Sequence, residues 1–169
     1  MVVRVAGPSF EEWATARVPA LLRFGYLVTG SHDAADEAVQ TALAQALAGW
    51  ERISRVEDPE RYVRRMVANA HVSGWRAFGR RVTPVAEVRP DDHAGDHALT
   101  VARHDAVWRV CRALPERQRA AVVLRFYEDL DYPEIAATLQ CAEATVRSYV
   151  HRALAALRVE LERQEADDA

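Results

Sequence analysis

The sequence contains no lysine, only two cysteines and no apolar run approaching the ~20 residues of a membrane span. All 22 basic residues of the 169-residue chain are arginine, which is typical of a GC-rich coding sequence and also suits bidentate recognition of phosphate or guanine. Cys111 and Cys141 have no CxxC or Cys/His cluster beside them, so buried free thiols are expected. Because the first residues lack the apolar core of a secretory signal, we expect a cytoplasmic protein.

The pattern of reactive residues gives little support to enzyme chemistry. The six histidines show no metal-binding spacing on a shared helical face. His93 and His97 are the best-spaced pair, but they fall in a segment without helical periodicity. We therefore expect no catalytic centre, no metal, no cofactor and no small-molecule substrate.

Hydrophobic residues make up half of the chain and recur mostly at helical spacing. They predict helices over residues 9–30, 31–50 and 58–78, with a kink near Pro19 in the first and Leu47 on the inward face of the second. No segment shows a convincing strand pattern. The expected fold class is all-α, in two small helical domains joined by a flexible linker.

The boundary between the two domains follows from a loss of periodicity. Residues 82–100 contain two prolines, a glycine and four acids, and they have no apolar face to bury. We therefore expect a first domain over residues 9–81, a linker over 82–100 and a second domain over 101–160. A short tail is expected after Val159.

Residues 130–152 have the pattern of a short helix, a tight turn and a second, basic helix. Asp131 suits an N-cap, Pro133 is tolerated in the first turn, and Glu134 occupies the capping-box position. The inward positions of the second helix are Val146, Val150, Leu154 and Leu157. This arrangement predicts a DNA-binding helix-turn-helix.

The second helix of this motif turns a polar face outward. Arg147, Ser148 and Arg152 are the firmer candidates for DNA contacts. Tyr149 could instead pack on its neighbours, and His151 could be an ordinary surface histidine. For the motif as a whole, the alternative is a solvated helical hairpin that does not bind DNA. The net charge of −3 does not exclude DNA binding, because residues 61–81 hold six arginines and no acid.

Two sets of motifs resemble the sigma-70 family of transcription initiation factors. Residues 114–136, beginning Leu-Pro-Glu-Arg-Gln-Arg, resemble its region 4, and residues 36–40 and 62–69 resemble parts of its region 2. The two-domain layout, without region 1.1 or a substantial region 3, is similar to the extracytoplasmic-function group. The chain departs from the family pattern where Gln140 and Ala144 replace glycines of the turn region.

The resemblance implies a sigma factor that binds core RNA polymerase and promoter DNA and directs promoter-specific initiation, with an anti-sigma factor as a further partner. The implied core-polymerase contacts are Asp36, Glu37 and Gln40. The implied contacts to the minus-10 element are Arg65, Asn69, Trp75, Arg76 and Arg80. The implied contacts to the minus-35 element are Thr145, Arg147, Ser148, Tyr149, His151 and Arg152.

Two alternatives stay open at this point. Trp75 is as well suited to the core of the first domain as to a base contact. A stand-alone helix-turn-helix repressor or activator is the alternative function, and it would bind an operator as a free symmetric dimer without polymerase.

Overall fold

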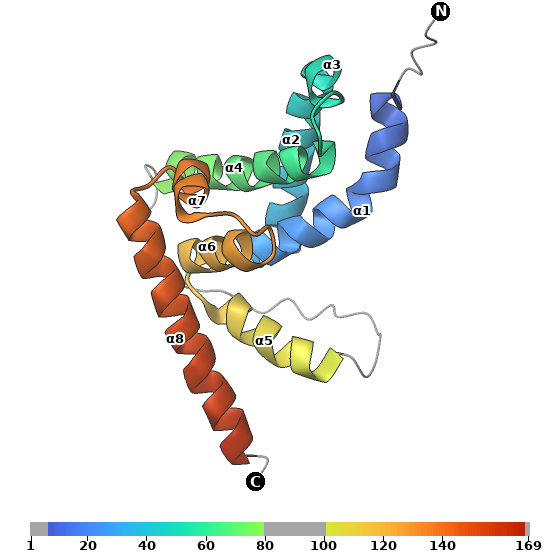
Figure 1. Cartoon of the computed structure of the whole chain (residues 1–169). Helices are drawn as coiled ribbons and strands as arrows, with labels where there is room; N and C mark the ends of the chain where they lie inside the picture. Colours follow the sequence, from blue (N-terminus) through green and yellow to red (C-terminus); the bar gives the residue numbers. More distant parts are fainter. Residues whose placement is uncertain (1–6, 80–100, 168–169) are drawn as a thin grey trace, which may run out of the picture.

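The structure is a computed structural model that describes residues 7–79 and 101–167, so the predicted linker lies outside the described residues (Figure 1). All regular structure in these two ranges is helical, as the periodicity predicts. None of the described helices is both long and apolar enough to cross a membrane. The helices are α1 (Phe10–Thr29), α2 (His32–Ala48), α3 (Trp50–Ile53), α4 (Pro59–Gly79), α5 (Val101–Ala113), α6 (Glu116–Phe126), α7 (Tyr132–Leu139) and α8 (Glu143–Asp167).

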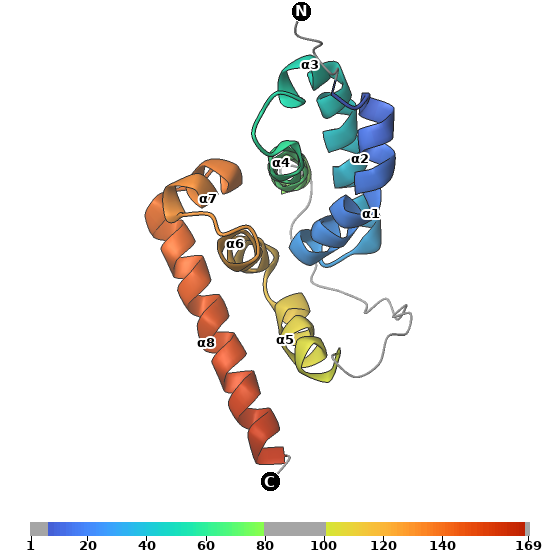
Figure 2. The ribbon, with the colours of Figure 1, turned by 45° about the vertical axis from the view of Figure 1, so that its right-hand side comes forward.

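Helices α1, α2 and α4 pack together into an N-terminal bundle, with the short α3 at one end (Figures 1 and 2). Local sequence sets the ends of α1. The Ser9 hydroxyl accepts from the Glu12 N–H at 3.2 Å, and the Glu12 carboxylate accepts from the Ser9 N–H at 3.0 Å. Gly30 ends the helix in the left-handed region with φ 71°. The ribbon of α1 bends midway, where Pro19 lies inside the helix.

Helices α5 to α8 form the C-terminal half, in which α8 packs against the other three. The predicted tail after Val159 is wrong in one respect, because α8 continues as helix to Asp167 (Figure 1). Residues 160–167 are mostly good helix formers without glycine or proline, and an ion pair between Arg163 and Glu160 supports this turn.

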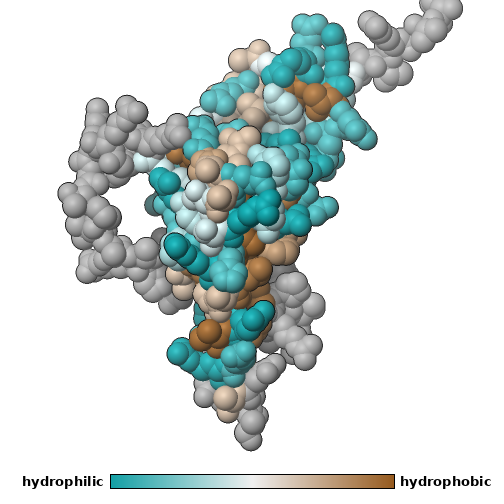
Figure 3. Space-filling model, turned by 60° about the vertical axis from the view of Figure 1, so that its left-hand side comes forward, coloured by the Kyte–Doolittle hydropathy of each residue, from teal (hydrophilic) through white to brown (hydrophobic). Residues whose placement is uncertain are grey.

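Two predicted inward residues lie at the surface. Leu47 of α2 is 58 % exposed and Leu154 of α8 is 41 % exposed. Each follows a fully buried alanine, Ala46 or Ala153, and a step of one residue rotates the side chain by about 100° around a helix. The small alanine therefore takes the contact position and the leucine faces outward. Figure 3 shows hydrophobic surface toward the lower end of the molecule, where α8 extends from the bundle.

The two halves pack directly on each other, with α1 against α6 and α4 against α7. We call this contact the seam. Buried residues of both halves, including Phe24 of α1 and Leu124 of α6, belong to one hydrophobic cluster. Two ring contacts reinforce it, at 6.0 Å between Phe24 and Tyr127 and at 5.4 Å between Tyr26 and Trp108. The halves thus share buried apolar surface, which stabilises their contact.

Arg119 of α6 crosses the seam as a buried guanidinium. Its nitrogens donate to the carbonyl oxygens of Val28 at 3.2 Å and Thr29 at 2.6 Å, at the C-terminal end of α1. They also donate to Arg112 at 3.0 Å and Leu114 at 3.3 Å, at the turn between α5 and α6. These bonds satisfy carbonyls that a helix end leaves without partners. One side chain thereby ties three helices together.

The end of α1 is shaped to receive this guanidinium. The last turn of α1 contains no basic residue of its own, so Arg119 supplies the cation that the negative end of the helix dipole favours. A Cβ atom at Gly30 would lie only 2.7 Å from Cζ of Arg119. Glycine is therefore required here for the left-handed backbone and for the space that the guanidinium fills.

Replacing Arg119 with methionine keeps a long apolar side chain but removes every donor. We expect Arg119→Met to lower the free energy of unfolding by roughly 2–4 kcal/mol, because buried carbonyls lose their partners. Arg119→Lys is the matched control, and it should recover only part of the loss since an ammonium lacks the planar fork of donors. Urea denaturation followed by circular dichroism measures both. A methionine variant as stable as the parent would contradict this role.

Candidate nucleic-acid and polymerase interfaces

The helix-turn-helix begins at a complete capping box on α7. Asp131 Oδ1 accepts from the Glu134 N–H at 2.9 Å, and Glu134 Oε2 accepts from the Asp131 N–H at 3.0 Å. At the other end of α7, Gln140 has φ 53° and ψ 48°. This is the left-handed conformation that a glycine would favour, and it costs another residue about 1 kcal/mol. The turn therefore keeps its geometry despite the departure from the family pattern.

The second helix of the motif, α8, buries one face and exposes four of the six predicted minus-35 residues on the other. Val146, Val150 and Ala153 are buried against the rest of the C-terminal half. The residues predicted to read the minus-35 element fall into two groups. Arg147, Ser148, His151 and Arg152 are exposed, whereas Thr145 and Tyr149 are half-buried. The Ser148 hydroxyl donates to the Ala144 carbonyl at 3.1 Å, which leaves its oxygen as an acceptor at the surface.

Arg147 is held in place at the head of α8. Its guanidinium forms an ion pair with Glu143 one turn earlier and lies 4.9 Å from the ring centroid of Tyr132 on α7. The hydrogen bond and charge of Glu143 raise the pKa of Arg147, so the side chain stays positively charged. A preoriented cation at this position loses little conformational entropy when it meets a base edge or a phosphate.

The candidate minus-10 residues lie along α4. Asn69 is exposed, and Arg65 is half-buried with one guanidinium nitrogen 2.6 Å from Glu134 Oε1 of α7. The side chain of Arg76 and the whole of Arg80 lie outside the described residues. Arg65 and Asn69 are one helical turn apart and share a face, as a strand-binding stripe requires.

Trp75 packs between groups from both halves. Its ring meets the His71 ring edge-on at 4.8 Å, and the guanidinium of Arg117 from α6 lies 5.5 Å from its centroid. Trp75 is half-buried against the hydrophobic cluster. The core interpretation of Trp75 therefore gains more support from these contacts than the base-contact interpretation does.

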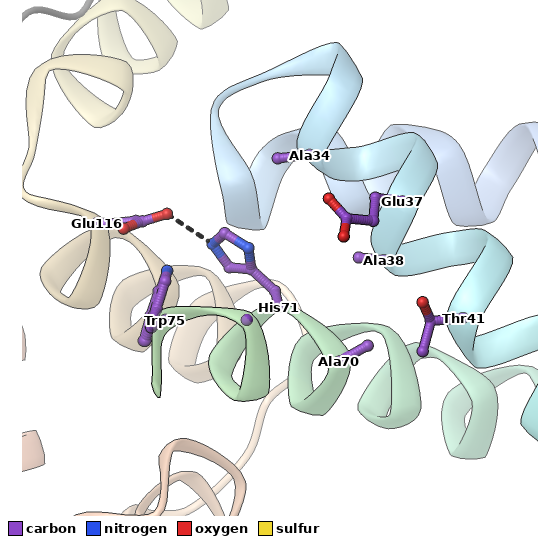
Figure 4. A pocket seen from close by; sticks show the side chains of 9 residues that line it. Ala34, Glu37, Ala38, Thr41, Ala70, His71, Trp75 and Glu116 are labelled. Carbon is purple, nitrogen blue, oxygen red and sulfur yellow. Dashed lines mark ion pairs between the residues drawn. The ribbon is translucent and has the colours of Figure 1, made fainter. Parts of the chain in front are cut away.

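The candidate core-polymerase residues Asp36, Glu37 and Gln40 are all exposed on α2. Glu37 also lines a pocket of about 330 Å³ between α2, α4 and α6 (Figure 4). Figure 4 shows its carboxylate pointing toward His71, with Trp75 and Glu116 farther along the same wall. The proposed docking face of α2 thus extends to this pocket, which lies between the two halves.

An ion pair spans this pocket from one half to the other. Nε2 of His71 on α4 lies 3.1 Å from Oε1 of Glu116 on α6. Burial alone would raise the pKa of the Glu116 carboxyl, but interactions with His71 and Trp75 outweigh burial and lower it. In the described parts of the chain, no three His, Cys, Asp or Glu side chains gather in a way that could hold a metal ion.

Four interacting groups at the seam were absent from the sequence-based list of functional residues. They are Arg61, Arg64, Glu128 and Glu134, whose contacts join α4 to the segment around α7. The i, i+4 spacing of Arg61 and Arg65 was visible in the sequence and could have indicated a shared face. Their acceptors, the Glu128 backbone carbonyl for Arg61 and the Glu134 carboxylate for Arg65, lie almost seventy residues away, and no local signal links them to the arginines.

Comparison with known proteins identifies relatives over nearly the whole chain. Residues 104–157 match the family model described as sigma-70, region 4. The chain is 34% identical to the RNA polymerase sigma-E factor of Streptomyces avermitilis over 158 residues, covering 94% of this chain and 88% of that protein. It is 35% identical to the protein of the same name from Streptomyces antibioticus over 161 residues, covering 94% and 87%.

Solved structures share the fold. The sigma factor RpoE of Bartonella quintana, solved in complex with the anti-sigma factor NepR, aligns with a TM-score of 0.59 at 24% identity, covering 90% of this chain and 96% of that one. The extracytoplasmic function sigma factor SigJ of Mycobacterium tuberculosis aligns with a TM-score of 0.52 at 23% identity, covering 87% and 52%.

The cap of α7 can be tested apart from any DNA contact. We expect Asp131→Ala to lower the free energy of unfolding by about 1 kcal/mol, because the Glu134 N–H loses its acceptor. Asp131→Asn keeps an acceptor oxygen at the same place and should stay within a few tenths of a kcal/mol of the parent. Thermal denaturation of the three proteins measures the difference. Equal losses for alanine and asparagine would show that the carboxylate charge, not the cap, is what matters.

Proposed function

Because the chain belongs to the sigma-70 family of RNA polymerase sigma factors, in its extracytoplasmic-function group, we propose that it binds core RNA polymerase and directs promoter-specific transcription initiation. Residues 9–81 would act as region 2, residues 82–100 as the linker and residues 101–160 as region 4. The helix-turn-helix carries this proposal, since α8 presents exposed polar and basic side chains beside a well-capped α7. The protein acts as a regulator without a catalytic centre, in the cytoplasm with polymerase and promoter.

The head of α8 is assigned to the minus-35 element. The exposed side chains of Arg147, Ser148, His151 and Arg152 follow one another within two helical turns, a length that fits the major groove. Thr145 and Tyr149 are half-buried and serve as secondary contacts in this assignment. Arginine pairs best with guanine, so Arg147 and Arg152 are the residues expected to discriminate bases.

Region 2 is assigned two tasks on two different helices. The exposed Asp36, Glu37 and Gln40 of α2 are proposed to dock on core polymerase. Arg65, Asn69, Arg76 and Arg80 of α4 and the residues after it are proposed to hold the minus-10 element, whereas the contacts of Trp75 favour a packing role. Arginines can grip the phosphates of a displaced strand, and an unstacked base offers edges that a duplex hides.

An anti-sigma factor is the further partner that we propose. The support is the overall likeness to the Bartonella quintana sigma factor, which was solved with such a protein bound. The apolar residues Leu154, Val159 and Leu161 are exposed on α8 and give a protein partner hydrophobic surface to cover.

Arg152 tests base reading by α8. We expect Arg152→Ala to cost about 1–3 kcal/mol of discrimination at one base of the minus-35 element, because a bidentate contact is lost. Transcription from promoters varied at single positions, with core polymerase present, measures this. Arg158→Ala removes an exposed arginine farther along α8 and is the control. An equal loss on every promoter would indicate a phosphate contact instead.

Asp36 and Glu37 test polymerase docking. Reversing both charges with Asp36→Arg and Glu37→Arg should abolish co-purification with core polymerase, because like charges would then meet at the interface. Glu160→Arg with Glu162→Arg makes the same change in net charge on α8 and should leave co-purification intact. Retained binding by the α2 variant would contradict the docking assignment, whether or not promoter recognition survives.

A further inference from the structure

On α4, a further arginine lies one helical turn before the first of the proposed minus-10 contacts. Arg61, Arg65 and Asn69 are spaced by four residues, so their side chains lie on one face of the helix. Arg61 and Arg65 are both half-buried, whereas Asn69 is exposed. The part of the stripe nearest the start of α4 is therefore covered, and the part beyond it is open.

Two carboxylates of the C-terminal half provide this cover. Glu134 on α7 places Oε1 2.6 Å from a terminal nitrogen of Arg65. Glu128, in the turn after α6, places Oε1 2.7 Å from Nε of Arg64, and its side chain is only 1% exposed. A terminal nitrogen of Arg61 lies 3.5 Å from the Glu128 carbonyl oxygen. Arg61 also attracts the charges of both carboxylates.

The surroundings of the two carboxylates affect their pKa values in opposite directions. Burial raises the pKa of Glu128 more than Arg64 and Arg61 lower it. The hydrogen bond from the Asp131 backbone, followed by the contact with Arg65, lowers the pKa of Glu134. Glu134 is therefore the carboxylate whose negative charge is stabilised, first by its own capping box and then by Arg65 across the seam.

The arginines keep unused donors in this arrangement. The Nε atoms of Arg61 and Arg65 are shielded from water and have no hydrogen-bond partner among the described residues. A guanidinium has five donor hydrogens in a planar fork that fits carboxylate and phosphate oxygens alike. A phosphodiester could therefore replace Glu134 and satisfy donors that the carboxylates leave free.

We propose that Arg61 and Arg65 form a binding site for the phosphates of a DNA strand, and that Glu134 occupies this site in the free protein as an internal substitute for phosphate. The inference rests on the proposed function and adds Arg61 to it. Because Glu134 belongs to α7, DNA that enters the site displaces the helix-turn-helix from α4. Strand binding by region 2 is thereby coupled to separation of the two halves.

Glu134→Gln is the sharpest test of this competition. Glutamine keeps the capping box, since its amide oxygen also accepts from the Asp131 N–H, but it removes the charge that holds Arg65. The free, full-length variant should bind a fluorescent single-stranded DNA oligonucleotide of mixed sequence roughly three- to tenfold more tightly than the parent. Fluorescence anisotropy measures the affinity.

Two further variants separate the proposal from simpler explanations. Glu160→Gln removes the same charge from an exposed ion pair on α8 and should leave the affinity nearly unchanged. Arg61→Ala, added to Glu134→Gln, should weaken binding and reduce the salt dependence of log K by about 0.7, the value for one phosphate contact on a single strand. A purely structural role for Arg61 would not change that slope.

Three results would overturn the proposal: equal affinity of the Glu134→Gln variant and the parent, an equal gain with Glu160→Gln, or an unchanged salt slope with Arg61→Ala. Transcription by the parent protein with core polymerase is measured in parallel. Failure of that assay would count against the proposed sigma function, whereas a negative anisotropy result beside normal transcription would count against internal phosphate mimicry alone.

Discussion

The buried guanidinium of Arg119 is the interaction on which the arrangement of the two halves depends. A charge inside a protein is stable only when its donors are satisfied, and here the acceptors come from α1 and from the turn between α5 and α6. Gly30 leaves the space that the group fills. Apolar contacts such as those between α1 and α6 are non-directional, whereas the directional hydrogen bonds of Arg119 favour one arrangement.

The way in which α1 packs against α6 determines which surfaces of the molecule are covered. With α6 fixed, the following turn brings Glu128 against Arg64, and α7 brings Glu134 against Arg65. The same packing leaves the polar face of α8 and the acidic face of α2 open. The faces proposed for the minus-35 element and for polymerase are thus accessible in the free protein, while part of the proposed minus-10 face is occupied.

This difference in access has a consequence for the proposed binding of polymerase and of DNA. Of the proposed polymerase contacts, Asp36 and Gln40 are exposed on α2, whereas Glu37 also lines the pocket to which Glu116 contributes. A partner that enters this pocket would contact residues of both halves, such as His71 and Glu116. A DNA strand on α4 would compete with Glu134 for Arg65. The DNA strand would thereby favour separation of the halves, because it binds the form in which Glu134 has left Arg65.

The sequence by itself determined the helices, their caps and the helix-turn-helix, because these depend on residues within one or two turns of each other. Ser9, Gly30 and Asp131 lie where the local pattern predicted. Helix faces were less certain, and Leu47 turned outward beside a buried alanine. Only the tertiary structure decided which groups meet across the seam, because Glu134 and the α1 acceptors of Arg119 lie far along the chain from their partners. Spacing and periodicity carry no information about such contacts.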